Sequence, residues 1–150
     1  MKKESYYPEP VMTDDLERER LIKKIPFDEK KVADALALAD RDIATARAIL
    51  SRDRDWAYTI AYNSALSAGR ALMFSKGFRP DGAHQHIAVV RFASSCLDEQ
   101  DAIAFERMRR KRYSTVYDTA GTISEAEAES AIRMAEKIIG SIRELIMNKS

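Results

Sequence analysis

Residues 107–112 carry the densest positive charge in the chain, because five of these six residues are arginine or lysine. Tyr113, Tyr117 and Asp118 follow within the next six residues. Guanidinium groups hold phosphate oxygens through paired hydrogen bonds, and tyrosine rings stack on nucleobases. This segment is therefore a candidate site for binding RNA or a nucleotide.

A helical conformation divides these cations between two faces. At about 100° per residue, Arg109 and Arg112 lie near one face of a helix, and Arg107 and Arg110 lie near an adjacent face. The cations therefore cannot all line a single site within one monomer.

A second interpretation makes residues 107–112 the solvated end of a helix. Lysine and arginine side chains near a helix C-terminus interact favourably with the helix dipole. Glu99, Asp101 or Glu106 on the same predicted helix could pair with them. Residue types and spacing leave both interpretations open.

A polar stripe interrupts an apolar, alanine-rich segment at Asn63, Ser67 and Arg70, which occupy positions i, i+4 and i+7. A buried arginine needs a hydrogen-bond acceptor. The stripe could line a groove beside residues 107–112, or Arg70 could pair with a carboxylate such as Asp118 and hold the helices in register. The complete candidate set for RNA or nucleotide binding is Asn63, Arg70, Arg109, Arg112, Tyr113, Tyr117 and Asp118.

Other kinds of site have little support in the sequence. His84 and His86 are the only histidines, and their i, i+2 spacing and the lack of further ligands argue against a metal site. We predict a capping or surface role for both. Cys96 is the only cysteine and is expected to be a buried thiol. No glycine-rich phosphate loop or serine-nucleophile motif is present, so we expect no metal ion and no cofactor.

Apolar residues at alternating spacings of three and four predict the helices that position these side chains. The predicted helices are residues 28–51, 56–76, 84–96, 99–117 and 124–147. The second of them is rich in small residues, stops at Gly77 and is expected to be the most buried. An N-terminal arm, residues 1–26, carries one predicted short helix at residues 14–24. Residues 78–82 are predicted to be a turn, and no strand pattern is visible.

These helices predict an all-α fold, an up-down antiparallel bundle of four main helices with a short extra helix. Asp98 can cap one helix, and Ser124 forms a capping box with Glu127 at the start of another. The chain has 150 residues, of which 45% are hydrophobic, and this suits one bundle domain at residues 27–150 after the arm.

Bulk charge identifies no partner, because the formal net charge is only +1. Any nucleic-acid role must therefore depend on local clustering of charge. Lys2 and Lys3 are not followed by an apolar stretch, and nowhere do 18 apolar residues run together. We expect a cytoplasmic protein that makes no contact with a membrane.

The segments DWAYTIAYNSALSAGRALMFSKGFRPDGAHQHIAVVRF and RMRRKRYSTVYD together resemble the HEPN domain. The resemblance covers residues 27–147 and is most specific at residues 56–86. It implies a helical bundle that dimerises through its polar motif. Members of this family act as ribonucleases, as toxins beside nucleotidyltransferase antitoxins, or as noncatalytic binders of RNA or nucleotides.

One residue departs from the pattern of the catalytic members, in which an arginine is followed four to six residues later by a histidine. Arg112 matches the arginine, but Tyr117 stands where the histidine would be. A tyrosine with an ordinary pKa near 10 is a poor base at neutral pH. Tyr117 could act as an acid or donor only if Arg109 and Arg112 strongly lowered its pKa.

The leading hypothesis is a homodimeric, noncatalytic HEPN protein that binds RNA or a nucleotide and acts with a nucleotidyltransferase-like partner. One alternative is a metal-independent ribonuclease of the toxin type that uses Arg112 and Tyr117. Another is a protein-interaction module in which the basic segment is only a solvated helix end.

Overall fold

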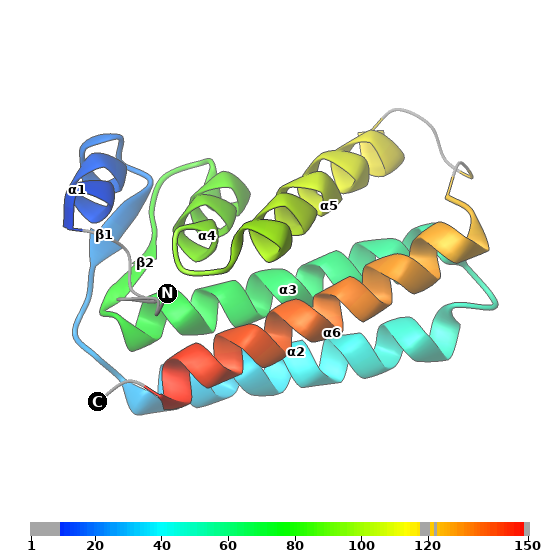
Figure 1. Ribbon diagram of the computed structural model, residues 1–150, viewed down its shortest axis with the longest axis horizontal. Coiled ribbons are helices and arrows are strands. Elements are labelled where there is room, and N and C mark those ends of the chain that lie inside the picture. Colours follow the sequence, from blue (N-terminus) through cyan, green and yellow to red (C-terminus); the bar gives the residue numbers. More distant parts are fainter. Residues whose placement is uncertain (1–9, 118–120, 122, 149–150) are drawn as a thin grey trace.

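The computed structural model describes residues 10–117, 121 and 123–148, with side chains except at residues 10–12 and 114–117. Three long helices lie along one another, and two further helices cover one side of them (Figure 1). The elements in chain order are α1 (Pro10–Arg18), β1 (Ile22–Lys24), α2 (Glu29–Ile49), α3 (Arg54–Ser75), β2 (Phe78–Pro80), α4 (Gln85–Ser94), α5 (Glu99–Tyr117) and α6 (Glu125–Met147). The fold is all-α, as predicted.

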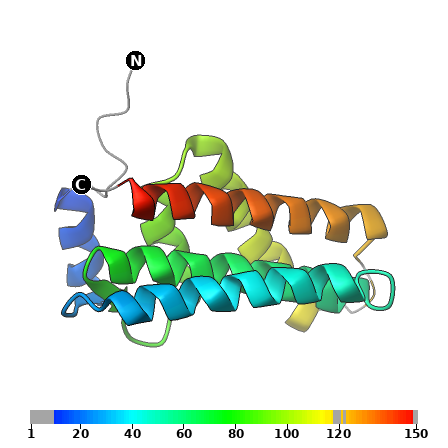
Figure 2. The same cartoon turned by 90° about the horizontal axis from the view of Figure 1, so that it is seen from below.

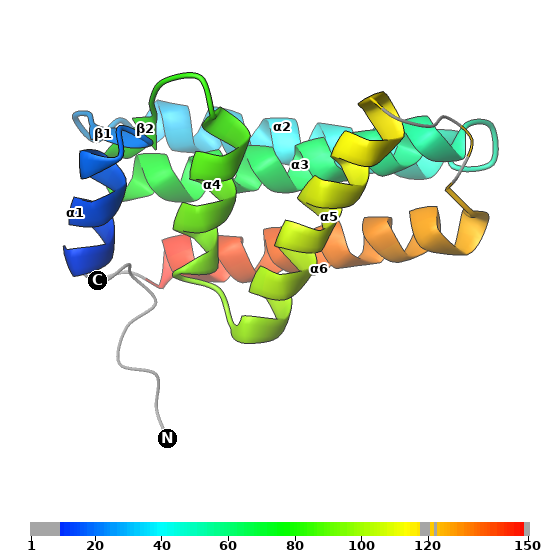
Figure 3. The ribbon, with the colours of Figure 1, turned by 90° about the horizontal axis from the view of Figure 1, so that it is seen from above.

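Helices α2, α3 and α6 form the long layer of the molecule, seen from below in Figure 2. Helices α4 and α5 cross this layer at a slant, as Figure 3 shows from above. The main helices α2, α3, α5 and α6 alternate in direction along the chain (Figure 1). Helix α4 is the short extra helix of the predicted bundle.

Side-chain caps fix where the long helices begin. The Asp28 carboxylate accepts a hydrogen bond from the Lys30 N–H at 2.9 Å, and Asp53 accepts one from the Trp56 N–H at 2.9 Å. Helix α3 ends before Gly77, whose φ of 83° is accessible to glycine without strain. The predictions for residues 28–51 and 56–76 are confirmed to within two residues at each end.

The later helices also begin where their caps predict. Asp98 accepts a hydrogen bond from the Asp101 N–H at 2.8 Å at the start of α5. Ser124 and Glu127 form the predicted capping box at the start of α6. Helix α5 has its predicted bounds, and α4 starts one residue later and ends two residues earlier than predicted.

The prediction of a helix at residues 14–24 is correct only for residues 14–18. Helix α1 covers Pro10–Arg18 in the described part of the chain. The helix is over before Arg20, whose φ is 62°. The chain then enters β1, which the sequence analysis missed.

The short strands β1 and β2 pair antiparallel, with Ile22 opposite Pro80 and Lys24 opposite Phe78. Residues 78–80 were predicted to be part of a turn, and the structure corrects this to a strand. Strands of three residues are too short to show a periodic pattern. Leu16 of α1 and Ile22 of β1 are almost fully buried and join the main core.

Helix α3 has more buried residues than any other helix in the described part of the chain, as predicted. Its small side chains let α4 approach closely. A Cβ atom built on Gly69 would lie 2.5 Å from Val89 Cγ1 of α4 and 3.8 Å from Phe105 Cε2 of α5. The glycine therefore lets α4 come closer to α3 than a residue with a Cβ would allow, whereas α5 stays at ordinary contact distance.

Within the described residues, none of the helices is long and apolar enough to cross a membrane.

We predict that Gly69→Ala lowers the free energy of unfolding by about 1–3 kcal/mol, because Val89 is branched at Cβ and has little room to move. The measurement is urea unfolding followed by circular dichroism. The matched control is Gly140→Ala in α6, where a Cβ would meet no atom within 4 Å. This control should gain about 0.5–1 kcal/mol from the more helix-favouring residue. A Gly69→Ala protein as stable as the control would contradict the packing described.

Candidate functional site

A cavity of about 550 Å³ lies between α3, the start of α4 and the later part of α5. Helix α3 contributes Arg70, and α5 contributes Arg109, Arg112 and Tyr113. The remaining lining residues are Ala83, His84, Gln85, His86 and Ile87. Among the described residues, no carboxylate lines this cavity. We call it the basic cavity.

Helix α5 divides its cations as its periodicity predicts. Arg109 and Arg112 face the basic cavity. Arg107 and Lys111 instead line a smaller groove of about 210 Å³ beside Tyr58 and α6. Arg110 is exposed. Only two of the five cations in residues 107–112 therefore belong to the basic cavity.

Glu106 pairs with two of these arginines. It accepts hydrogen bonds from Arg109 Nε at 3.0 Å and Nη2 at 2.7 Å, and from Arg110 Nε at 2.8 Å. The hydrogen bond from Arg109 is the main cause that lowers the pKa of Glu106, and it raises the pKa of Arg109 in turn. The predicted pairing with Glu106 is thus present, and it accounts for Arg109 and Arg110 but not for Arg112.

Arg70 and Arg112 lack such a carboxylate partner within the described part of the chain. Burial lowers the pKa of Arg70, and Tyr62 opposes this effect only in part. The Nε of Arg112 is buried without a hydrogen-bond partner in the described structure. A buried donor left unpaired costs about 1–3 kcal/mol, and more when it is charged. The guanidinium groups of Arg70 and Arg112 are therefore available to bind an anion.

His86 is a site residue that the sequence analysis missed. It lines the basic cavity, and its Nδ1 lies 3.3 Å from the Tyr62 hydroxyl. The predicted capping or surface role is therefore wrong for His86. His84 is exposed at the N-cap of α4, but its side chain makes no capping hydrogen bond in the described structure. His86 lies near Arg109 and Arg112 because α4 packs beside α5, and the sequence pattern does not show this packing.

The surroundings of His86 favour its neutral form. Burial lowers its pKa, and the positive charges of Arg112, Arg70 and Arg109 lower it further. Its ring meets the ring of Tyr62 edge-on, with centroids 5.6 Å apart. The imidazole is therefore uncharged at neutral pH while the cavity is empty.

The hydrogen bond with Tyr62 determines which nitrogen of the neutral His86 ring carries its hydrogen. Its side chain is fully buried, and burial raises its pKa, so the hydroxyl stays protonated. A buried hydroxyl needs an acceptor for its hydrogen, and His86 Nδ1 is the acceptor within reach. Tyr62 then donates to Nδ1, and the hydrogen of the neutral ring lies on Nε2.

The remaining predicted site residues do not all line the basic cavity. Asn63 is half-buried on α3, two turns before Arg70, and does not line the basic cavity. Tyr113 lies on the cavity rim and is 59% exposed. Tyr117 is the last residue of α5, and its side chain lies outside the described part. Asp118, the suggested partner of Arg70, lies outside the described residues altogether.

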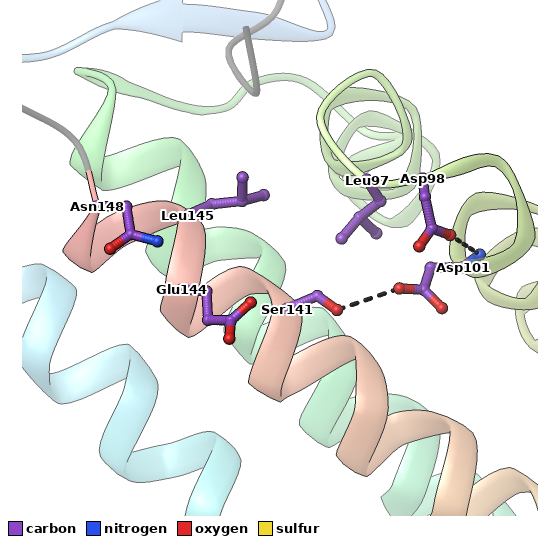
Figure 4. Close-up of a pocket in the computed structure, with 7 residues that line it drawn as sticks. All are labelled: Leu97, Asp98, Asp101, Ser141, Glu144, Leu145 and Asn148. Atoms are coloured by element: carbon purple, nitrogen blue, oxygen red, sulfur yellow. Dashed lines mark hydrogen bonds between the residues drawn. The ribbon is translucent and has the colours of Figure 1, made fainter. Parts of the chain in front are cut away.

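A second cavity, of about 270 Å³, is acidic and lies between the start of α5 and the end of α6 (Figure 4). Asp98, Asp101 and Glu144 line it. Asp101 is only 1% exposed and accepts hydrogen bonds from Lys137 Nζ at 2.5 Å and Ser141 Oγ at 3.1 Å. In the described part of the chain no cluster of side chains could hold a metal ion. The hydrogen bonds that Asp101 accepts at this cavity therefore join α5 to α6.

The family model for the HEPN domain matches residues 32–145, from the first turn of α2 to the last turns of α6. The match includes all residues that line the basic cavity. No curated protein matches the chain.

We predict that His86 titrates below the ordinary histidine value of about 6.5, and that Arg112→Met raises its pKa. Removing the guanidinium removes a charge that repels the imidazolium. The measurement is an NMR titration of the imidazole signals, with His84→Asn used to assign the two rings. The control is Arg110→Met, which removes a cation that lies outside the cavity. An Arg112→Met titration identical to wild type would contradict the proximity of these groups.

Proposed function

Because the chain belongs to the HEPN domain family, we propose that it is a noncatalytic protein that binds RNA or a nucleotide through phosphate in the basic cavity. One observation carries the proposal. Three guanidinium groups converge on a concave surface whose described lining contains no carboxylate. A volume of about 550 Å³ lies within the usual range of small-ligand pockets.

Electrostatics favours an anion at this position. Arg70 and Arg112 both line the cavity, and neither has a carboxylate partner in the described structure. A phosphate in the cavity would offset both positive charges through forked hydrogen bonds from the guanidinium groups. The first residues of α4 also line the cavity, and the start of a helix favours negative charge.

The hydrogen-bond arrangement of His86 supports binding without catalysis. Nδ1 accepts from Tyr62, and Nε2 carries the ring hydrogen. The neutral ring therefore has no free lone pair with which to remove a proton from a ribose hydroxyl. It has an N–H to donate to a phosphate oxygen instead.

Tyr113 supplies a second element of the proposed ligand site. Its ring is mostly exposed at the rim of the cavity that holds Arg109 and Arg112. A base attached to a phosphate in the cavity could stack on this ring, and such stacking contributes about 1–3 kcal/mol per base. Phosphate and base would thus be bound by neighbouring turns of α5.

We extend the proposal to assembly. The family relationship supports a homodimer, and α5, which exposes Ile103 and Tyr113, is the surface that we assign to it. The family relationship supports a nucleotidyltransferase-like partner, in the manner of a toxin–antitoxin pair.

We predict that the double variant Arg109→Glu/Arg112→Glu loses at least tenfold in affinity for a fluorescent single-stranded RNA or an adenine nucleotide. The negative charges would repel phosphate from the cavity. The measurement is fluorescence anisotropy at low salt, with helicity checked by circular dichroism. The matched control is Arg107→Glu/Arg110→Glu, which makes the same charge change on the same helix outside the cavity.

Equal losses in both double variants would mean that net charge alone attracts the ligand. Absence of binding by the wild type at low salt would favour the protein-interaction module.

The second candidate function is a metal-independent ribonuclease, because His86 places an imidazole in the same cavity as Arg112. In that case purified protein should cleave RNA in the presence of EDTA, and Arg112→Ala and His86→Ala should each abolish cleavage. The noncatalytic proposal predicts no cleavage above that of a mock purification. Cleavage that both variants lose would establish the second function instead.

A further inference from the structure

We propose that the basic cavity selects a terminal phosphate, a phosphomonoester, over an internal phosphodiester, and that His86 takes up a proton when this ligand binds. This inference rests on the proposed function and names the ligand class of the same site. It follows from the number of charges in the cavity and from the placement of His86 and Tyr62 among them.

The charge of the cavity suits an anion with more than one negative charge. Glu106 is shared between Arg109 and Arg110, so among the described residues no carboxylate pairs with Arg70 or Arg112. A phosphomonoester carries a charge of about −1.5 to −2 at pH 7. An internal phosphodiester carries a single negative charge, so one cation would stay unbalanced after it bound.

The protonation of His86 differs between these two ligands. The groups that face it are Arg70 and Tyr62 from α3, Arg109 and Arg112 from α5, and His84 from the same helix start. With the cavity empty, the three guanidinium groups repel a protonated ring. A dianion offsets that repulsion and attracts the imidazolium. A monoanion leaves much of the repulsion in place.

The protonation step takes a proton from solvent and reverses a hydrogen bond. His86 then no longer accepts the hydrogen of the buried Tyr62 hydroxyl, and the attraction of the dianion for the imidazolium must offset that loss. In the empty cavity, Tyr62 donates to Nδ1 and Nε2 carries the hydrogen. When Nδ1 takes up a proton, it becomes a donor to the Tyr62 oxygen, and Nε2–H is free to bind phosphate. The 3.3 Å separation between the Tyr62 oxygen and Nδ1 suits either direction of donation.

The position of Tyr113 suits the same ligand class. This ring lies on the rim of the cavity, whose lining comes from α3, α4 and α5. A terminal phosphate has one substituent and can enter with its nucleoside toward this ring.

Isothermal titration calorimetry at pH 7 tests the proposal with three probes: AMP, the dinucleoside monophosphate ApA and adenosine. Titrations in two buffers of different ionisation enthalpy give the number of protons taken up. We expect AMP to bind at least tenfold more tightly than ApA, with proton uptake for AMP and much less for ApA. Adenosine should bind most weakly of the three.

Two variants assign the effect to His86. His86→Gln keeps a neutral N–H donor but cannot take up a proton at this pH, so proton uptake should vanish and the preference for AMP should fall several-fold. Arg110→Met should keep both. Circular dichroism checks that each variant is folded. A preference and proton uptake that persist in His86→Gln would overturn the assignment.

The outcomes separate this inference from the function on which it rests. ApA binding as tightly as AMP, without proton uptake, would overturn the ligand class and leave the binding function standing. No binding of any phosphate probe would overturn the proposed function itself. Tetra-adenylate with a 5′-phosphate, compared with AMP, identifies the source of the phosphate: tighter binding of the oligonucleotide indicates an RNA end, and tighter binding of AMP indicates a free nucleotide.

Discussion

Helix α4 rests on α3 at Gly69, where one added carbon would meet Val89. This close approach places the start of α4 beside the later turns of α5, because both helices cross the same central helix (Figure 3). His86 and Tyr62 come within hydrogen-bond distance as a result, and Arg70 comes to face Arg112 across the cavity. The site therefore depends on a packing contact made by residues with no chemistry of their own.

The charged residues of α5 have different roles at its two ends. Near its start, the buried Asp101 binds Lys137 and Ser141 and so holds the helix against α6. Further along, Glu106 restrains Arg109 and Arg110, whereas Arg112 keeps an unpartnered Nε within the described structure. Removing a partner of the buried Asp101 would leave an uncompensated charge inside the fold, whereas the positive charges at the open cavity are available to a ligand.

Local signals in the sequence predicted most of the fold but only part of the site. Caps such as Asp53 and the Ser124–Glu127 box act within one turn, so they are visible in the sequence and gave nearly correct boundaries. The strands β1 and β2 were missed for two reasons. Each has only three residues, and the two strands that pair lie far apart in the sequence. Helical periodicity alone separated Arg109 and Arg112 from Arg107. The position of His86 depends on how α4 packs on α3, which a sequence pattern does not record.

The central claim is that phosphate binds in the basic cavity, and the arginine Nε–H signals in NMR test it most directly. On titration with AMP, the Nε–H signals of Arg70, Arg109 and Arg112 should shift together and saturate. Arg47 and Arg143, which pair with Glu136 and Asp40 between α2 and α6, supply internal controls whose signals should stay in place. Saturating shifts at Arg47 or Arg143 without shifts at Arg112, or no shift at any arginine, would contradict the account.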